Sequence, residues 1–205
     1  MQASYASILL FGPPGVGKGT QGAMLSSIPG FCHLGTGDMF RALDRDSDLG
    51  KEFLKYSTEG LLVPDDLTIQ VWHTHVQSMI EGQLYNPDRD VLLLDGIPRS
   101  KPQALAMDQY LDVLGVVHLV CQDIDQMVER LRHRAQTQRR PDDIDETVIR
   151  RRFNVYQKET APVLAHYDRD IICDIDAIGS PAAVLLKILN FIVPATESRL
   201  GNPLS

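Results

Sequence analysis

The sequence lacks the features that define several large protein classes. It has only three cysteines among 205 residues, Cys32, Cys121 and Cys173, and their spacing matches no metal motif. We therefore expect buried free thiols in a reducing compartment. No apolar run is long enough to span a membrane. The apolar stretch 7–11 has no basic flank, so we predict no signal peptide and expect a cytoplasmic protein that binds no membrane.

Basic residues are also too few for a general nucleic-acid binder. Twenty Lys and Arg residues against 27 Asp and Glu give a formal net charge of −7, so no overall basic field exists. The positive charge is concentrated instead, because eight of the 14 arginines lie between 130 and 152. We interpret this segment as a local anion site. Its members are Arg130, Arg132, Arg134, Arg139, Arg140, Arg150, Arg151 and Arg152.

Hydrophobic periodicity predicts a single α/β domain. Short apolar runs are expected to form strands at 7–11, 31–34, 91–94, 116–121 and 170–175. Helical periods lie near 18–26, 38–46, 50–58, 65–81, 101–113, 125–135, 145–167 and 181–192. This alternation predicts a three-layer α/β/α domain with a five-stranded parallel sheet. Within it we expect a core at 1–35, 67–133 and 145–193, a helical insertion at about 36–66, a loop at about 134–144 and a frayed tail at 194–205.

A glycine-rich loop follows the first apolar run and reads GPPGVGKGTQ at 12–21. The form G-x-x-x-x-G-K predicts a phosphate-binding loop (P-loop), in which backbone N–H groups surround phosphate oxygens. Lys18 adds a positive charge, and the helix that follows directs its positive dipole end to the same anion. Gly19 takes the place of the usual Ser or Thr after the lysine, and the hydroxyl comes next at Thr20. An ordinary Gly/Pro turn is the alternative.

A second set of polar residues lies at the ends of later elements. Asp95 ends an apolar strand as in a Walker B motif and would orient Mg²⁺ or its waters, although such a residue can also cap a turn. Arg99 would bind a phosphate, and Gln103 is placed to read a base edge. Arg41 lies near enough to reach a second anion. We interpret Asp65 as a helix N-cap.

Capping is likewise an alternative for Thr36 and Asp38. Arg130 and Arg134 are four residues apart, so their side chains converge on one helix face. Asp142 and Asp143 are expected to order arginines through bidentate pairs.

Together these motifs resemble the adenylate kinase branch of the nucleoside monophosphate kinases. The resemblance runs from about residue 8 to 190 and includes GPPGVGKGTQ, LGTGDMFR, GLLVPD, LLLDGIPRSKPQ and the arginine-rich segment. It implies an ATP site at Gly15, Val16, Gly17, Lys18, Gly19, Thr20, Arg130, Arg134 and Gly179. It implies an AMP site at Thr36, Arg41, Leu61, Leu62, Val63, Gly96, Ile97, Pro98, Arg99, Gln103, Arg140 and Arg152. The catalytic set it implies is Lys18, Arg99, Arg130, Arg134, Arg140 and Arg152.

The resemblance also implies a reaction, MgATP + AMP ⇌ 2 ADP, carried out by a monomer without zinc. Asp95 would hold the metal through water. The insertion at 36–66 would bind the monophosphate, and 134–144 would form a short lid. Thr36 and Gln103 match adenine-reading positions, which favours AMP over UMP or CMP. A UMP/CMP kinase and a catalytically silent nucleotide-binding protein are the alternatives, whereas a GTPase would need an N-K-x-D motif that is absent.

Three positions depart from the family pattern. Ile97 replaces the usual Phe, and Arg139-Arg140 doubles a position that often holds one arginine. The segment from Asp142-Asp143 to Tyr156 is one residue longer than usual. Counting forward from the aspartates selects Arg151 as the last AMP-binding arginine. Counting back from Tyr156 and Thr160 selects Arg152, which we favour because we expect a continuous helix there.

Overall fold

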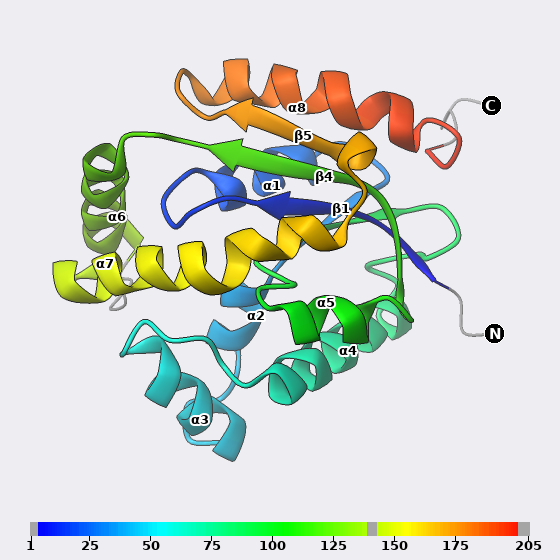
Figure 1. Cartoon of the computed structure of the whole chain (residues 1–205). Coiled ribbons are helices and arrows are strands. Elements are labelled where there is room, and N and C mark those ends of the chain that lie inside the picture. Colours follow the sequence, from blue (N-terminus) through cyan, green and yellow to red (C-terminus); the bar gives the residue numbers. More distant parts are fainter. Residues whose placement is uncertain (1–3, 139–142, 201–205) are drawn as a thin grey trace.

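The computed structural model describes residues 4–138 and 143–200. Its centre is one sheet of five parallel strands in the order β2-β3-β1-β4-β5 (Figure 1). The strands are β1 (Tyr5–Phe11), β2 (Phe31–Gly35), β3 (Val91–Asp95), β4 (Leu111–Val120) and β5 (Ile172–Asp176). The predicted fold class, a P-loop α/β protein with a five-stranded parallel sheet, is confirmed.

The α-helices are α1 (Lys18–Leu25), α2 (Thr36–Arg41), α3 (Asp48–Ser57), α4 (Asp65–Glu81), α5 (Lys101–Met107), α6 (Ile124–Gln138), α7 (Glu146–Val155) and α8 (Pro181–Thr196). Between α7 and β5 lie a π-helical turn, η2 (Tyr156–Thr160), and two short 3₁₀ segments, η3 (Ala161–His166) and η4 (Arg169–Ile171).

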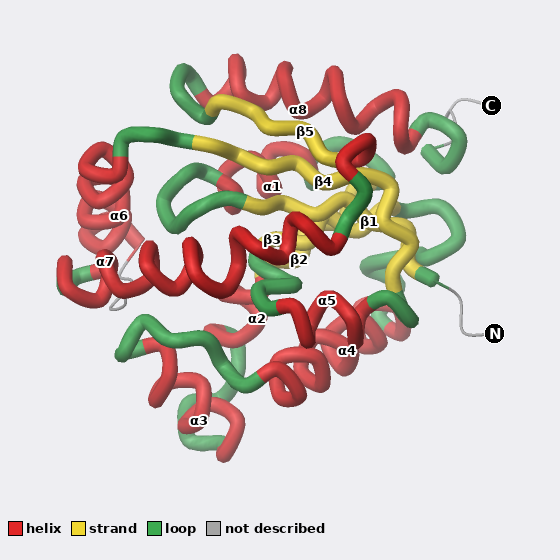
Figure 2. The backbone as a smooth tube through the Cα atoms, in the orientation of Figure 1, coloured by secondary structure: helices red, strands yellow, loops and turns green. Residues whose placement is uncertain are grey.

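Both faces of the sheet are covered, as Figure 2 shows. Successive strand residues point to opposite faces. In β1, Ile8 and Leu10 belong to the core cluster that includes α1 and α8 residues, whereas Leu9 and Phe11 belong to the cluster with α4 and α5. This two-sided burial explains why the strands are almost continuously apolar.

The carboxyl ends of the strands share one edge of the sheet. In Figure 1 the arrowheads of β1, β4 and β5 point towards α6 and α7, and α3 lies apart from the sheet below α2. The P-loop leaves β1 at this edge. Ligands of open parallel sheets bind beyond the carboxyl ends of the strands, so this edge is the place to search for a site.

Some element boundaries differ from those predicted. The helix expected at 101–113 ends at Met107, and β4 begins at Leu111 because its first residues pair with β1, where Tyr5 faces Leu111. The helix expected at 38–46 runs only from Thr36 to Arg41. The region 145–167 is not one continuous helix, because Pro162 has no N–H to donate and the chain changes to π and 3₁₀ geometry.

Two helices extend beyond their predicted ends. Helix α6 continues to Gln138, so only the later part of the predicted loop 134–144 follows it, and 139–142 lie outside the described residues. Helix α8 continues to Thr196, past the predicted start of the tail at 194. The fully buried Thr196 donates a hydrogen bond from its hydroxyl to the Ile192 carbonyl (2.9 Å), which holds the last turn. The three cysteines are free but only partly buried.

Candidate active site

The P-loop curls around the side chain of Lys18, the first residue of α1. Gly12 has a φ of +142°, and a Cβ there would lie 2.5 Å from the Leu119 carbonyl oxygen, so only glycine fits. The Lys18 ammonium group donates hydrogen bonds to the carbonyls of Gly12 (2.7 Å) and Pro13 (3.1 Å). The loop thus holds the ammonium group against its own backbone, at the edge of the sheet where β1 ends.

The cationic form of Lys18 is disfavoured by its surroundings. Burial lowers the pKa of Lys18 to about 8, the carboxylate of Asp95 opposes the shift, and the positive charges of Arg99, Arg152 and Arg134 add to it. These three arginines come from the loop after β3, from α7 and from α6. The structure therefore gathers positive charge from distant segments around the P-loop lysine, a suitable environment for a polyphosphate.

The end of β3, the strand next to β1, forms a further part of the site. The Thr36 hydroxyl donates to the carbonyl of Gly96 (2.9 Å), and the guanidinium of Arg99 donates to the Thr36 hydroxyl (3.2 Å) and to the Gly96 carbonyl (2.6 Å). Gly96 has a φ of +83°, and a Cβ there would lie 2.5 Å from the Arg99 guanidinium. The N-cap of α2 is Gly35, so Thr36 does not cap this helix. The Thr36 hydroxyl instead accepts a hydrogen bond from Arg99.

A buried carboxylate orders two arginines. Asp143 is 0% exposed, and its carboxylate binds Arg134 of α6 (2.7 Å from Nε) and Arg152 of α7 (2.5 Å from Nη1). The predicted role of the aspartate pair in ordering arginines is thus seen at Asp143, whereas Asp142 lies outside the described residues.

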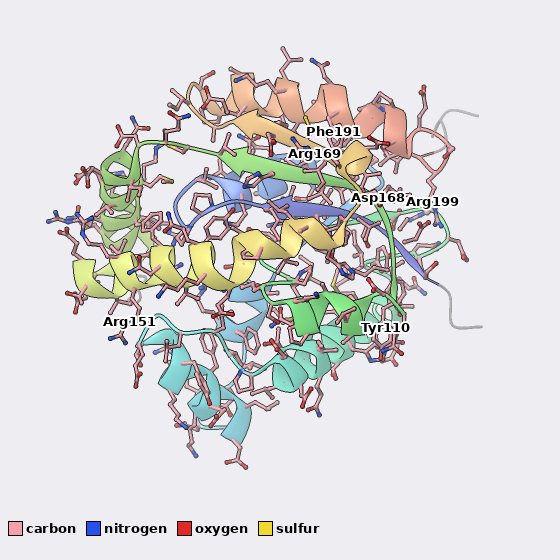
Figure 3. The ribbon with its side chains drawn as sticks, viewed as in Figure 1. Tyr110, Arg151, Asp168, Arg169, Phe191 and Arg199 are labelled. Carbon is pink, nitrogen blue, oxygen red and sulfur yellow. The ribbon has the colours of Figure 1, made fainter. Side chains whose placement is uncertain are left out.

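Arg151 and Arg152 differ in their surroundings. Arg152 lines the cavity described below, whereas the exposed Arg151 donates to the backbone carbonyl of Glu59 (3.1 Å) in the loop after α3. Figure 3 shows Arg151 at this junction between α7 and the loop. Arg152, the residue that the sequence favours, is thus the one that lines the cavity, and its role in AMP binding stays a prediction. The single α-helix on which that preference rested ends at Val155.

Two further predicted arginines have other surroundings. Arg130 is exposed on α6, and Arg41 pairs with Asp38 of its own helix (2.7 Å). Arg140 lies outside the described residues.

A cavity lies between the P-loop, the end of β3, helices α2 and α3, and α7. Ten of the predicted site residues line it. They are Lys18, Thr36, Leu61, Leu62, Val63, Gly96, Pro98, Arg99, Gln103 and Arg152. One wall is apolar and includes Phe40 and Phe53, whose rings stack 5.1 Å apart. The cavity therefore combines an apolar pocket suited to a flat ring with a cluster of cations suited to phosphates.

Known proteins with similar sequences identify this arrangement. A family model described as adenylate kinase matches residues 10–172. Adenylate kinases from Kocuria rhizophila, Rhodopirellula baltica and Flavobacterium johnsoniae are 41%, 40% and 35% identical to this chain. The alignments cover 89%, 90% and 91% of the chain and 96%, 95% and 97% of these relatives, respectively. The chain belongs to the adenylate kinase family.

In this adenylate kinase family member, the carboxylate of Asp95 faces the P-loop. A Cβ on Gly19 would lie 3.5 Å from Asp95 Oδ2, and His33 Nε2 lies 3.8 Å from the same oxygen. Burial alone would raise the pKa of Asp95, but His33, Lys18 and Arg99 together lower it. The ionised group beside the P-loop fits Mg²⁺, which binds proteins through one or two carboxylates together with substrate phosphates.

Other predicted ATP residues of the family member lie along the P-loop and beyond it. Val16 is buried and Thr20 is exposed. Gly15 has a φ of +79° and sits against Leu131 of α6. Gly179 precedes Ser180, the N-cap of α8, and α8 reaches α1 through a hydrogen bond from the Gln21 amide to the Pro181 carbonyl (3.0 Å). Among the predicted AMP residues, Ile97 is 1% exposed and packs in the core.

Residues 4–138 and 143–200 contain no group of three or more His, Cys, Asp or Glu side chains arranged to hold a metal ion. In the same part of the chain, no helix combines the length and apolar character that crossing a membrane requires.

Sequence reasoning missed several residues of the site. Phe40, Phe53, Tyr156 and Thr160 line the cavity, and the Thr160 hydroxyl donates to the Arg99 carbonyl (2.9 Å). Periodicity within a helix gives no sign of such contacts, because they join elements that are distant in the sequence. The assignment of Asp65 as an N-cap is wrong: the N-cap of α4 is Pro64, and the Asp65 carboxylate faces α5.

Proposed function

We propose that the chain catalyses reversible transfer of the γ-phosphoryl group of MgATP to AMP, giving two ADP. The observation that carries this proposal is the cavity between the P-loop lysine and the insertion. Its lining holds the cations Lys18, Arg99 and Arg152, and it also holds Thr36 and Gln103 together with apolar side chains. ATP would occupy the P-loop side and AMP the insertion side, so that the two phosphate chains meet at the arginines.

The proposed reaction needs no general acid–base catalysis. The attacking atom is a phosphate oxygen of AMP that is already ionised near neutral pH, so no general base is needed. Catalysis then depends on alignment, exclusion of water and neutralisation of charge on the transferring group. Lys18, Arg99, Arg134 and Arg152 would supply the neutralising charges, with Arg130 and Arg140 as further members of the predicted set. Bound Mg²⁺, which Asp95 and Thr20 would hold, withdraws charge from the phosphate oxygens.

The finer features of the proposal follow the same reasoning. The insertion at about 36–66 would bind the monophosphate, and the loop at about 134–144 would act as a short lid that excludes water. One chain supplies all of the cavity residues, which suits a monomeric enzyme. The small number and wide spacing of the cysteines suit a cytoplasmic enzyme without a zinc site.

The test is an acceptor panel with two site variants and one control variant. Initial rates with ATP and each of AMP, UMP, CMP and GMP should be highest with AMP. Lys18→Met and Arg99→Ala should each lower turnover by about 10²-fold or more, because each removes a charge that stabilises the transition state. Lys101→Ala, which removes an exposed cation two residues from Arg99, should keep near-normal rates.

Circular dichroism of all three variants should match the parent chain. Near-normal rates for folded Lys18→Met and Arg99→Ala would refute the phosphotransferase, and a strong preference for UMP or CMP would refute the choice of AMP.

A further inference from the structure

The side-chain amide of Gln103 is held from two sides. Its nitrogen donates to Asp65 Oδ1 (2.8 Å), and its oxygen accepts from the backbone N–H of Arg99 (2.7 Å). The same Asp65 oxygen accepts from the Ser100 hydroxyl (2.8 Å), and Ser100 is the N-cap of α5. Gln103 is only 1% exposed, yet it lines the cavity. Asp65 therefore joins the start of α4 to a carboxamide in the cavity wall.

These two partners allow a single orientation of the amide. A carboxylate only accepts hydrogen bonds, so the NH₂ group of Gln103 must face Asp65. A backbone N–H only donates, so the oxygen must face Arg99. Rotating the amide by half a turn would place oxygen against oxygen and N–H against N–H. What remains for a ligand is one N–H and one oxygen lone pair in a fixed arrangement.

We propose that Asp65 is a positioning residue that determines base specificity by fixing the Gln103 amide in the orientation that reads adenine. Adenine carries an amino donor at the position where guanine carries a carbonyl acceptor. An amide that can rotate offers either its oxygen or its NH₂ group at that position and accommodates both bases. A locked amide offers only one pattern, and the other base meets an unpaired, repulsive contact. This inference rests on the proposed function.

A purely structural role for Asp65 predicts a different result. An acidic residue in the first turn of a helix interacts favourably with the helix dipole. Asp66 shares this position in the first turn of α4 but is exposed. Asp66→Asn therefore removes the same kind of charge from the same turn without touching the amide, and it is the matched control for Asp65→Asn.

The test compares AMP with GMP. In Asp65→Asn the new amide both donates and accepts, so only the backbone N–H of Arg99 still favours one orientation and the Gln103 amide is held less firmly. We expect the ratio of kcat/KM for AMP to that for GMP to fall about tenfold or more, mainly through a higher KM for AMP. Asp66→Asn should keep the ratio. Asp65→Ser, which also removes the pure acceptor, should repeat the effect and serves if Asp65→Asn folds poorly.

Two further measurements separate the possible outcomes. In a Gln103→Met background, Asp65→Asn should no longer change the ratio, because the lock acts through the amide. Calorimetric binding of AMP and GMP without ATP should show the same loss of discrimination, independent of turnover. An unchanged ratio in Asp65→Asn and Asp65→Ser, or equal losses for both nucleotides, would overturn the inference. Failure of the parent chain to phosphorylate AMP while these binding ratios behave as expected would refute the proposed function alone.

Discussion

Lys18 is a cation in surroundings that favour its neutral form. Its pKa is lowered to about 8, first by burial and then by three nearby arginines, so the ligand-free protein loses this charge as the pH rises through about 8. Since the lysine must be charged to bind phosphate, we predict that kcat/KM for MgATP falls on the alkaline side of about pH 8. A rate profile from pH 6 to 10, at constant ionic strength, measures this limb. A profile that stays flat well above the lysine pKa would contradict the prediction.

The lowered pKa of Lys18 also makes the free energy of unfolding depend on pH. The unfolded chain holds the Lys18 proton up to about the ordinary lysine pKa of 10.5, whereas the folded chain releases it near 8. Between these values the unfolded state binds more protons, so this group makes the free energy of unfolding rise with pH. Bound ATP would reverse the preference, because the phosphates stabilise the cation. One residue would thus couple nucleotide binding to proton uptake.

At the scale of elements, Asp143 joins α6 to α7. Its fully buried carboxylate binds Arg134 and Arg152, which are 28% and 24% exposed. Asp143→Asn keeps the shape but places a neutral amide between the two cations. We predict a loss of about 3 kcal/mol in the free energy of unfolding, at the low end for a broken buried pair because the arginines reach solvent. Turnover should also fall, since neither arginine keeps its place, and urea unfolding with initial rates measures both.

Glu146→Gln is the matched control for this prediction. It removes an exposed carboxylate that pairs with Arg150 (2.9 Å) on the same face of α7, and exposed pairs contribute little. Stability and turnover should therefore stay near those of the parent chain. If Asp143→Asn behaved like Glu146→Gln, the carboxylate would not be what holds the two helices and their arginines in place.

At the scale of the whole molecule, local motifs were predictable and contacts between distant segments were not. The P-loop and the strand that ends in Asp95 carry short-range signals, because glycine spacing and continuous apolar runs are fixed by neighbours in the sequence. The start of β4 at Leu111 depends on pairing with β1, whereas the break after α7 is associated with Pro162, a local signal that the prediction of one helix at 145–167 overlooked. Asp65 looked like a helix cap because its partners, Ser100 and Gln103, are 35 and 38 residues away.

The cavity lies between the P-loop and the insertion at about 36–66. One ligand that contacts both segments should therefore stabilise the protein more than either nucleotide alone. A ligand at 100 times its Kd adds about 2.7 kcal/mol to stability, or roughly 5–10 °C in Tm for a chain of this size. We predict that two adenosines joined by five phosphates raise Tm more than ATP or AMP at equal concentration with Mg²⁺. In Lys18→Met the gain from ATP and from the joined ligand should shrink, while the gain from AMP should persist. A joined ligand that performed no better than ATP alone would place the two nucleotides in separate, unconnected sites, and direct transfer between them would then be untenable.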